Sequence, residues 1–195
     1  GSGGLGTLLI QLCKTAGASF VAAVSSDAAL CTSLGADRVS DHRSEEWCDV
    51  AEYKEAPFDV VIDLAVGVEA WRQARRKGVL KAGSRGGRFV AVVLNEWHID
   101  IHRYHQLFTF ILPPLFRQLS SWFTSAFTPR YKMYIGTANA ETIAKVFGAL
   151  REGRFQRVVL DGESPHPFTE EGVRAAFRKQ ESRRGKGKVV VDIVG

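Results

Sequence analysis

Three glycines at the start of the chain carry the clearest chemical signal. Gly1, Gly3 and Gly6 stand in the spacing G-x-G-x-x-G, and the apolar residues after them recur at intervals of three and four. Glycines allow a tight turn and a close backbone approach, and a helix that begins there presents free N–H groups and its positive dipole end. The loop is therefore predicted to bind a pyrophosphate, and its members are Gly1, Ser2, Gly3, Gly4, Leu5 and Gly6. The alternative is a turn with a structural role only.

The residues about twenty positions further on bear on which dinucleotide binds. An acidic side chain after the second strand of such a unit binds the adenosine ribose of NAD, and a carboxylate there repels the 2′-phosphate of NADP. With the strand ending at Val24, Ser25 and Ser26 occupy this place and can donate to a phosphate. Asp27 competes for the role but fits better as a helix N-cap. We therefore expect NADP(H) in preference to NAD(H).

Two basic side chains follow the next predicted strand. His42 and Arg43 could place positive charge near the 2′-phosphate, although Arg43 fits a solvated surface arginine equally well.

Other constellations point to chemistry more weakly. His98, His102 and His105 could share one helical face, but no carboxylate is clearly aligned with them, and we expect no metal in this chain. The three cysteines form no CxxC pair, which argues against a disulfide framework and a structural zinc site. The sequence lacks the G-x-S-x-G of hydrolases, the Tyr-x-x-x-Lys of short-chain dehydrogenases and the lysine of a P-loop.

Apolar runs alternate with helical patterns along most of the chain, which is typical of a parallel sheet covered on both faces. The predicted helices are 4–16, 27–34, 44–53, 68–81, 139–152 and 169–181. The predicted strands are 20–24, 38–40, 58–64, 88–94, 131–135, 156–160 and 189–194. The fold class is therefore α/β, a Rossmann-type doubly wound parallel sheet.

Residues 95–129 fit this alternation least well. We expect a helix that breaks at Pro113 and Pro114. Its aromatic side chains are expected in the core, with a substrate or partner surface as the alternative; they are Trp97, Phe108, Phe110, Phe116, Trp122 and Phe123.

We expect that the first strand of the fold is not included in this sequence. The glycine loop normally follows the first strand, which lies at the centre of the order 3-2-1-4-5-6. Without it, backbone groups on two strand edges would be unpaired, at about 1–3 kcal/mol for each buried group. We expect residues 1–195 to be one dinucleotide-binding domain, truncated at its N-terminus and poorly cooperative when expressed alone.

Several stretches, in order along nearly the whole chain, resemble the medium-chain dehydrogenase/reductase superfamily and its quinone oxidoreductase branch. Residues 1–14 are similar to its phosphate loop and first helix, and Leu-Gly-Ala-Asp at 34–37 with Asp-His-Arg at 41–43 is similar to its next signature. Residues 58–63 and 87–90 resemble its fourth and fifth strands, and the Gly-Lys-Val-Val at 187–190 resembles its C-terminal signature. Within the branch, reticulon-4-interacting-protein-like oxidoreductases are most similar.

The chain departs from the family pattern at its cofactor site, and Ala28 and Ala29 stand where a lysine is often found after the paired serines. His42 stands where the family usually has tyrosine, and Ala65 and Val66 stand where it tends to have a polar residue and glycine. By the resemblance, these positions and Lys188 of the C-terminal signature join the cofactor-binding residues.

The resemblance implies the zinc-binding-dehydrogenase-type cofactor domain of an NADPH-dependent oxidoreductase. Such an enzyme transfers hydride to a quinone or to an activated alkene or carbonyl. Its catalytic residues are expected in an N-terminal chaperonin-10-like barrel that this chain lacks, so the chain alone is expected to be inactive. A homodimer is also expected. The alternative is a nucleotide-sensing or interaction domain that has kept the fold and lost the chemistry.

Composition and charge limit the classes of molecule that the protein is expected to bind. With 45% hydrophobic and 24% charged residues, the 195-residue chain is not disordered. Its formal charge of +5 comes from residues 72–88 and 174–188, and the remainder is net acidic. Neither basic segment resembles a nucleic-acid module, so a small-molecule substrate is expected and nucleic acid is not.

No signal peptide or stable membrane span is expected. An intracellular location is predicted, with cytoplasm and mitochondrion both open.

Overall fold

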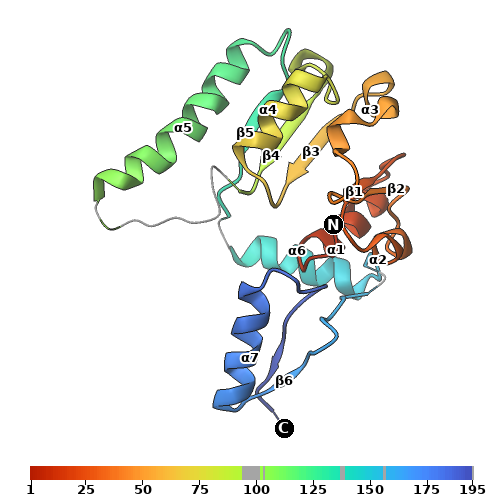
Figure 1. Ribbon diagram of the computed structural model, residues 1–195, viewed down its shortest axis with the longest axis vertical. Coiled ribbons are helices and arrows are strands. Elements are labelled where there is room, and N and C mark those ends of the chain that lie inside the picture. Colours follow the sequence, from red (N-terminus) through yellow and green to blue (C-terminus); the bar gives the residue numbers. More distant parts are fainter. Residues whose placement is uncertain (94–101, 103, 137–138, 156, 195) are drawn as a thin grey trace. The chain divides into compact units, whose positions relative to one another are not determined.

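The computed structural model describes residues 1–93, 102, 104–136, 139–155 and 157–194 (Figure 1). The chain forms two compact units. The first contains Gly1–Trp47 and Ala138–Gly195, and the second contains Cys48–Thr137. Each unit holds parallel strands and helices, so the predicted α/β class is confirmed.

The N-terminal part of the first unit is a βα arrangement behind the glycine loop. Its elements are α1 (Gly6–Thr15), β1 (Ala22–Val24), α2 (Ala28–Ser33) and β2 (Arg38–Ser40). Strands β1 and β2 are parallel, with Val24 opposite Ser40, so their carboxyl ends share one edge. Apolar side chains from α1, β1, α2 and their connections form the core, and Val39 of β2 packs against it; the core residues are Ile10, Val21, Ala23, Cys31, Leu34 and Ala36.

The C-terminal part of the same unit contains α6 (Ala140–Arg151), β6 (His166–Pro167), α7 (Glu170–Glu181) and β7 (Val191–Asp192). Strand β6 pairs with β7 in parallel. The caps follow from sequence, because Asn139 and Thr169 accept hydrogen bonds from backbone N–H groups three residues on, at 2.7 and 3.1 Å.

The strand predicted at 156–160 is wrong for its described residues, 157–160. There, Leu160 makes one isolated bridge, to Lys188. At Arg157 a side chain takes the place of a strand partner: Gln11 Nε2 donates to the Arg157 carbonyl at 3.0 Å, and the Arg157 N–H donates to Gln11 Oε1 at 3.1 Å. Val158 and Leu160 are exposed, so the apolar pattern predicted neither the burial nor the pairing of this segment.

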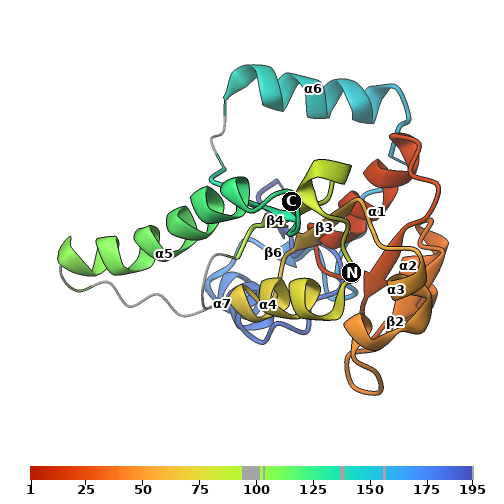
Figure 2. The same cartoon turned by 90° about the horizontal axis from the view of Figure 1, so that it is seen from above.

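The second unit is a three-stranded parallel sheet with helices. Its elements are a 3₁₀ turn at its start (Trp47–Asp49), α3 (Ala51–Glu55), β3 (Val60–Asp63), α4 (Val68–Lys77), a second 3₁₀ turn (Gly83–Arg85), β4 (Arg88–Ala91), α5 (Tyr104–Phe123) and β5 (Arg130–Met133). The strand order is β3-β4-β5, and α4 lies beside the sheet (Figure 2). The single helix predicted at 44–53 is wrong, because a 3₁₀ turn and a short helix replace it.

An aromatic cluster joins α4 to the sheet of the second unit. The Trp71 ring lies edge-on to Phe89 at 5.4 Å and to Tyr131 at 5.2 Å between centroids. All three side chains are buried, and Phe89 is fully so. Such pairs add about 0.5–1.5 kcal/mol each beyond area burial.

The break expected at Pro113 and Pro114 is also wrong, since α5 continues through both. An interior proline costs about 3 kcal/mol in an isolated helix. Here the following turns are held by β5: the Tyr131 N–H donates to Ser121 Oγ and the Met133 N–H donates to Gln118 Oε1, both at 2.8 Å. Tertiary contacts therefore offset the proline cost.

The aromatic residues of α5 are mostly not core residues. Phe108, Phe116, Trp122 and Phe123 are each more than three-fifths exposed, which contradicts the core assignment for these four. Phe110 is half-buried, and Trp97 lies outside the described residues. Despite its apolar surface, α5 does not qualify as a membrane span, and neither does any other helix in the described part of the chain.

Candidate functional site

The glycine loop makes a tight turn that requires glycine at its last position. A Cβ atom on Gly6 would collide with the carbonyl oxygen of Gly1, so the first and last glycines of the motif touch. Above Gly3, by contrast, the described residues place no heavy atom within 4 Å of where a Cβ would stand. Packing within the described chain does not demand glycine at position 3, but close approach by a ligand would.

Helix α1 begins at the end of this loop. No side chain in the described residues caps its N-terminus, and its first turn carries no acidic residue. The positive end of the helix dipole is therefore not neutralised by a neighbouring carboxylate of that turn, which favours an anion.

A turn from the far end of the chain, Gly185–Lys188, lies against the glycine loop; we call it the lysine turn. Gly187 forms a parallel bridge with Gly3, and its N–H donates to the Ser2 carbonyl at 2.8 Å. The Lys188 Nζ donates to the Gly4 carbonyl, also at 2.8 Å. The structure thus brings Lys188 to the predicted phosphate loop, 184 residues away in sequence.

Gly187 is the residue that allows this approach. Its φ of +83° lies in the left-handed region, and an added Cβ would collide with the backbone of Val159. Glycine is therefore required here by both backbone conformation and space.

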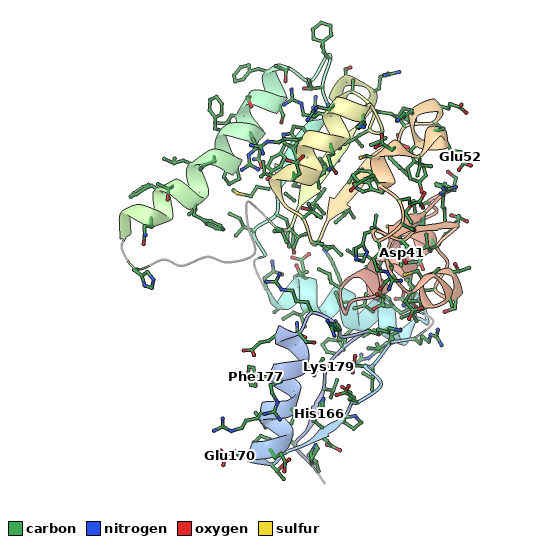
Figure 3. The ribbon with its side chains drawn as sticks, in the orientation of Figure 1. Asp41, Glu52, His166, Glu170, Phe177 and Lys179 are labelled. Atoms are coloured by element: carbon green, nitrogen blue, oxygen red, sulfur yellow. The ribbon has the colours of Figure 1, made fainter. Side chains whose placement is uncertain are left out.

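Asp161, which sequence reasoning missed, fixes the lysine turn. Its buried carboxylate accepts hydrogen bonds from the N–H of Lys186 at 2.8 Å and of Glu163 at 3.2 Å. The Lys179 ammonium, which extends from α7 (Figure 3), lies 3.4 Å away. Burial alone would raise the pKa of Asp161, but these donors together hold it below its ordinary value. In the sequence, the feature that could have identified Asp161 is its place as a single acidic residue directly after the apolar run 158–160.

The predicted ribose-binding residues lie at the shared carboxyl edge of β1 and β2. Ser25 is buried, and its Oγ accepts a hydrogen bond from the Asp27 N–H at 3.1 Å. Ser26 is exposed. Asp27 caps α2 as expected, because its Oδ1 accepts from the Leu30 N–H at 3.0 Å.

His42 and Arg43 are at the same edge, but Arg43 is engaged locally. Its guanidinium bonds both oxygens of Asp41, with Nε 3.0 Å from Oδ1 and Nη2 2.6 Å from Oδ2. These bonds lower the pKa of the Asp41 carboxyl to about 2. His42 is exposed, with Nδ1 3.9 Å from Asp41 Oδ1. The guanidinium fork therefore faces a carboxylate of its own loop (Asp41 is labelled in Figure 3).

Ala65 and Val66 belong to the second unit, whereas the contacts above join residues of the first. They follow β3, and their N–H groups donate to the buried Asp63 carboxylate at 3.0 and 2.9 Å. Gly67 donates to the same carboxylate at 2.5 Å. Asp63, a second residue that the motif analysis missed, thus shapes the turn between β3 and α4.

The described residues contain no group of three or more His, Cys, Asp or Glu side chains placed to hold a metal ion. Of the three histidines singled out, His98 lies outside the described residues and His102 is exposed before α5 begins. The expected absence of a metal stays a prediction.

The first unit fits a phosphorylated dinucleotide on three grounds. The space above Gly3 is open, α1 has no capping carboxylate, and two lysines of the C-terminal turn reach the loop and the strand edge. These features match the demands of a pyrophosphate and a further phosphate.

Comparison with known proteins agrees with this geometry. The family model described as zinc-binding dehydrogenase matches residues 34–191. Two relatives are 30% identical over 194 residues: the 2-methylene-furan-3-one reductase of Solanum lycopersicum and the chloroplastic NADPH-dependent alkenal/one oxidoreductase of Arabidopsis thaliana. Each match covers 98% of this chain and 38% of the relative.

Among solved structures, the quinone oxidoreductase of Coxiella burnetii is similar with a TM-score of 0.65 and 22% identity, over 99% of this chain and 50% of that one. The chain thus spans about two-fifths to one half of the length of these relatives. The Rossmann-type fold and the resemblance to the quinone oxidoreductase branch are confirmed. The narrower similarity to reticulon-4-interacting-protein-like enzymes stays a prediction.

Proposed function

Because this chain belongs to the zinc-binding dehydrogenase family, we propose that it is the cofactor-binding part of an NADPH-dependent oxidoreductase. Residues 1–195 would form one dinucleotide-binding domain within a longer enzyme. The share of the relatives' length that the chain covers supports this assignment.

The observation that carries the proposal is the contact between the lysine turn and the glycine loop. Gly187 and Lys188 bond the carbonyls of Ser2 and Gly4, so these loop carbonyls face the turn. A pyrophosphate would then meet N–H groups at the open side of Gly3, with the Lys188 ammonium close by. The loop and Lys188 bind and orient; they transfer no proton.

The second phosphate of NADPH would lie at the carboxyl edge of β1 and β2. Ser25 and Ser26 supply hydroxyls there, and Lys186 supplies a cation beside Asp27. Bound NADPH supplies a hydride, and we propose a quinone or an activated alkene or carbonyl as its acceptor. The names of the two plant reductases support an activated alkene or carbonyl, and the Coxiella protein supports a quinone.

The residues that contact this substrate are proposed to lie in the part of the relatives that the chain does not cover. Residues 1–195 would then contribute cofactor binding and need the remaining sequence for turnover.

The test is a titration of the complete protein with NADPH, followed by turnover with a quinone and with an enone. We expect saturable NADPH binding and substrate-dependent loss of absorbance at the nicotinamide band. Binding without oxidation across both substrate classes would support a nucleotide-sensing domain instead. Failure to bind any nicotinamide dinucleotide would contradict the proposal.

A further inference from the structure

Asp27 stands close to the position at which an NAD-binding fold carries its ribose-binding carboxylate. It follows β1 by two serines, and it is the acidic side chain that would be expected to favour NADH and repel NADPH. The sequence therefore gives two conflicting indications: the serine hydroxyls favour binding of a 2′-phosphate, and the Asp27 carboxylate disfavours it. The structure shows what happens to the carboxylate.

Both oxygens of Asp27 are already engaged. Oδ1 accepts the Leu30 N–H at 3.0 Å and caps α2, and Oδ2 lies 2.7 Å from Lys186 Nζ. A ribose diol needs a carboxylate oxygen that is ready to accept its hydroxyls. An ammonium on Oδ2 competes with that role and cancels the negative charge.

Lys186 reaches Asp27 because the lysine turn is held in place. Its own N–H donates to the buried Asp161 carboxylate at 2.8 Å, and the neighbouring Gly187 N–H donates to the Ser2 carbonyl at 2.8 Å. The position of the Lys186 backbone is thus fixed from both sides.

Asp27 and Lys186 differ in their exposure to solvent. The Asp27 side chain is 19% exposed and the Lys186 side chain 60% exposed, so the ammonium meets solvent while the carboxylate lies mostly covered. A charge that is covered and paired interacts more strongly with its partner than one in open water.

We propose that Lys186 is a specificity-determining residue that admits the 2′-phosphate of NADPH by neutralising Asp27. This inference rests on the proposed function, since it assumes that the strand edge receives a dinucleotide. The paired Asp27 carries no net charge toward the phosphate, whereas Asp27 without Lys186 would repel it. Lys186 therefore acts through Asp27, as a positioning and charge-compensating residue.

The test measures equilibrium dissociation constants of NADPH and NADH for the complete protein and three variants, Lys186→Met, Asp27→Asn and the double variant. Asparagine is a good N-cap, so Asp27→Asn removes the charge and keeps α2 capped. Lys145→Met is the matched control, because Lys145 makes an exposed ion pair with Glu141 on α6 and its loss changes the net charge equally.

We expect Lys186→Met to reduce the preference for NADPH over NADH by roughly tenfold, mostly through weaker NADPH binding. Asp27→Asn should preserve or increase the preference. In the Asp27→Asn background, Lys186→Met should change the preference by about threefold or less, since no carboxylate remains to be neutralised.

Two results would overturn the inference while leaving the proposed function intact. The preference could be the same in Lys186→Met as in Lys145→Met, or Lys186→Met could reduce it equally with and without Asp27, which would mean that Lys186 binds the phosphate directly. If the unmodified protein bound neither dinucleotide, the proposed function would fail and this inference with it.

Discussion

Replacing Asp161 by asparagine should loosen the lysine turn and weaken cofactor binding together. The carboxylate accepts two backbone N–H groups and the Lys179 ammonium while only 3% exposed. Asparagine keeps one carbonyl oxygen, but its NH₂ group cannot accept the second N–H. A hydrogen bond to a charged acceptor contributes about 1.5–3 kcal/mol, so we expect a loss of about 2–3 kcal/mol of unfolding free energy.

The consequence for binding follows from where the turn lies. Lys186 and Lys188 reach Asp27 and Gly4 only while the turn keeps its place. We expect NADPH to bind roughly tenfold more weakly to Asp161→Asn, which corresponds to about 1.4 kcal/mol. Urea denaturation and calorimetric titration of the complete protein measure the two effects.

The pH dependence of the same variant checks the physical cause. The pKa of Asp161 is lowered in the folded protein, so its contribution to stability is fully present above the ordinary carboxyl pKa. That contribution is lost as the pH falls through the lowered pKa. The unfolding free energy of Asp161→Asn should therefore fall less steeply on acidification than that of the unmodified protein.

Glu163→Gln is the matched control, since it removes an exposed partner of Lys179 and leaves the Asp161 carboxylate in place. An exposed ion pair contributes little, so stability and binding should stay near the unmodified values. Unchanged stability and NADPH affinity in Asp161→Asn would refute the role assigned to Asp161.

Three further substitutions test separate parts of the structure. Gly187→Ala should lower the unfolding free energy by about 3 kcal/mol in urea denaturation, because the added Cβ collides with Val159 at a residue of positive φ. The control Gly153→Ala, at φ +65° in open space, should lower it by only about 1–2 kcal/mol. Equal losses in the two variants would contradict the contact with Val159. Gln11→Leu should lower the unfolding free energy by about 2 kcal/mol, because two backbone groups of Arg157 lose their partner, and a neutral result would argue against that contact. Arg43→Gln should raise the Asp41 pKa, as followed by NMR, from about 2 toward the ordinary value near 4. The pKa should rise because the ion pair with Arg43 is what stabilises the charged form of Asp41. An Asp41 pKa that stayed at about 2 in the variant would exclude Arg43 as the cause.

Local patterns predicted much of the first unit. The strand at Arg38–Ser40 has the predicted bounds, and Asp27 caps the following helix as its residue type suggested. These features depend on a few neighbouring residues, so sequence alone specifies them.

Features that depend on distant residues were predicted poorly. The helix α5 continues through two prolines because β5 holds it. At 157–160, Arg157 bonds a glutamine side chain, and Leu160 forms an isolated bridge with Lys188 instead of a strand ladder. Asp161 was missed for the same reason, since its partners become visible only when the chain is folded. Lys188 was predicted by resemblance, and the structure supplied the contact with Gly4.

The most direct test of the central claim is an experimental structure of the complete protein with NADPH bound. We expect the pyrophosphate on the N–H groups of the loop Gly1–Gly6, on the open side of Gly3, and the 2′-phosphate at the carboxyl edge of β1 and β2. A pyrophosphate bound elsewhere, or a 2′-phosphate remote from Ser25, Ser26 and Lys186, would contradict the account.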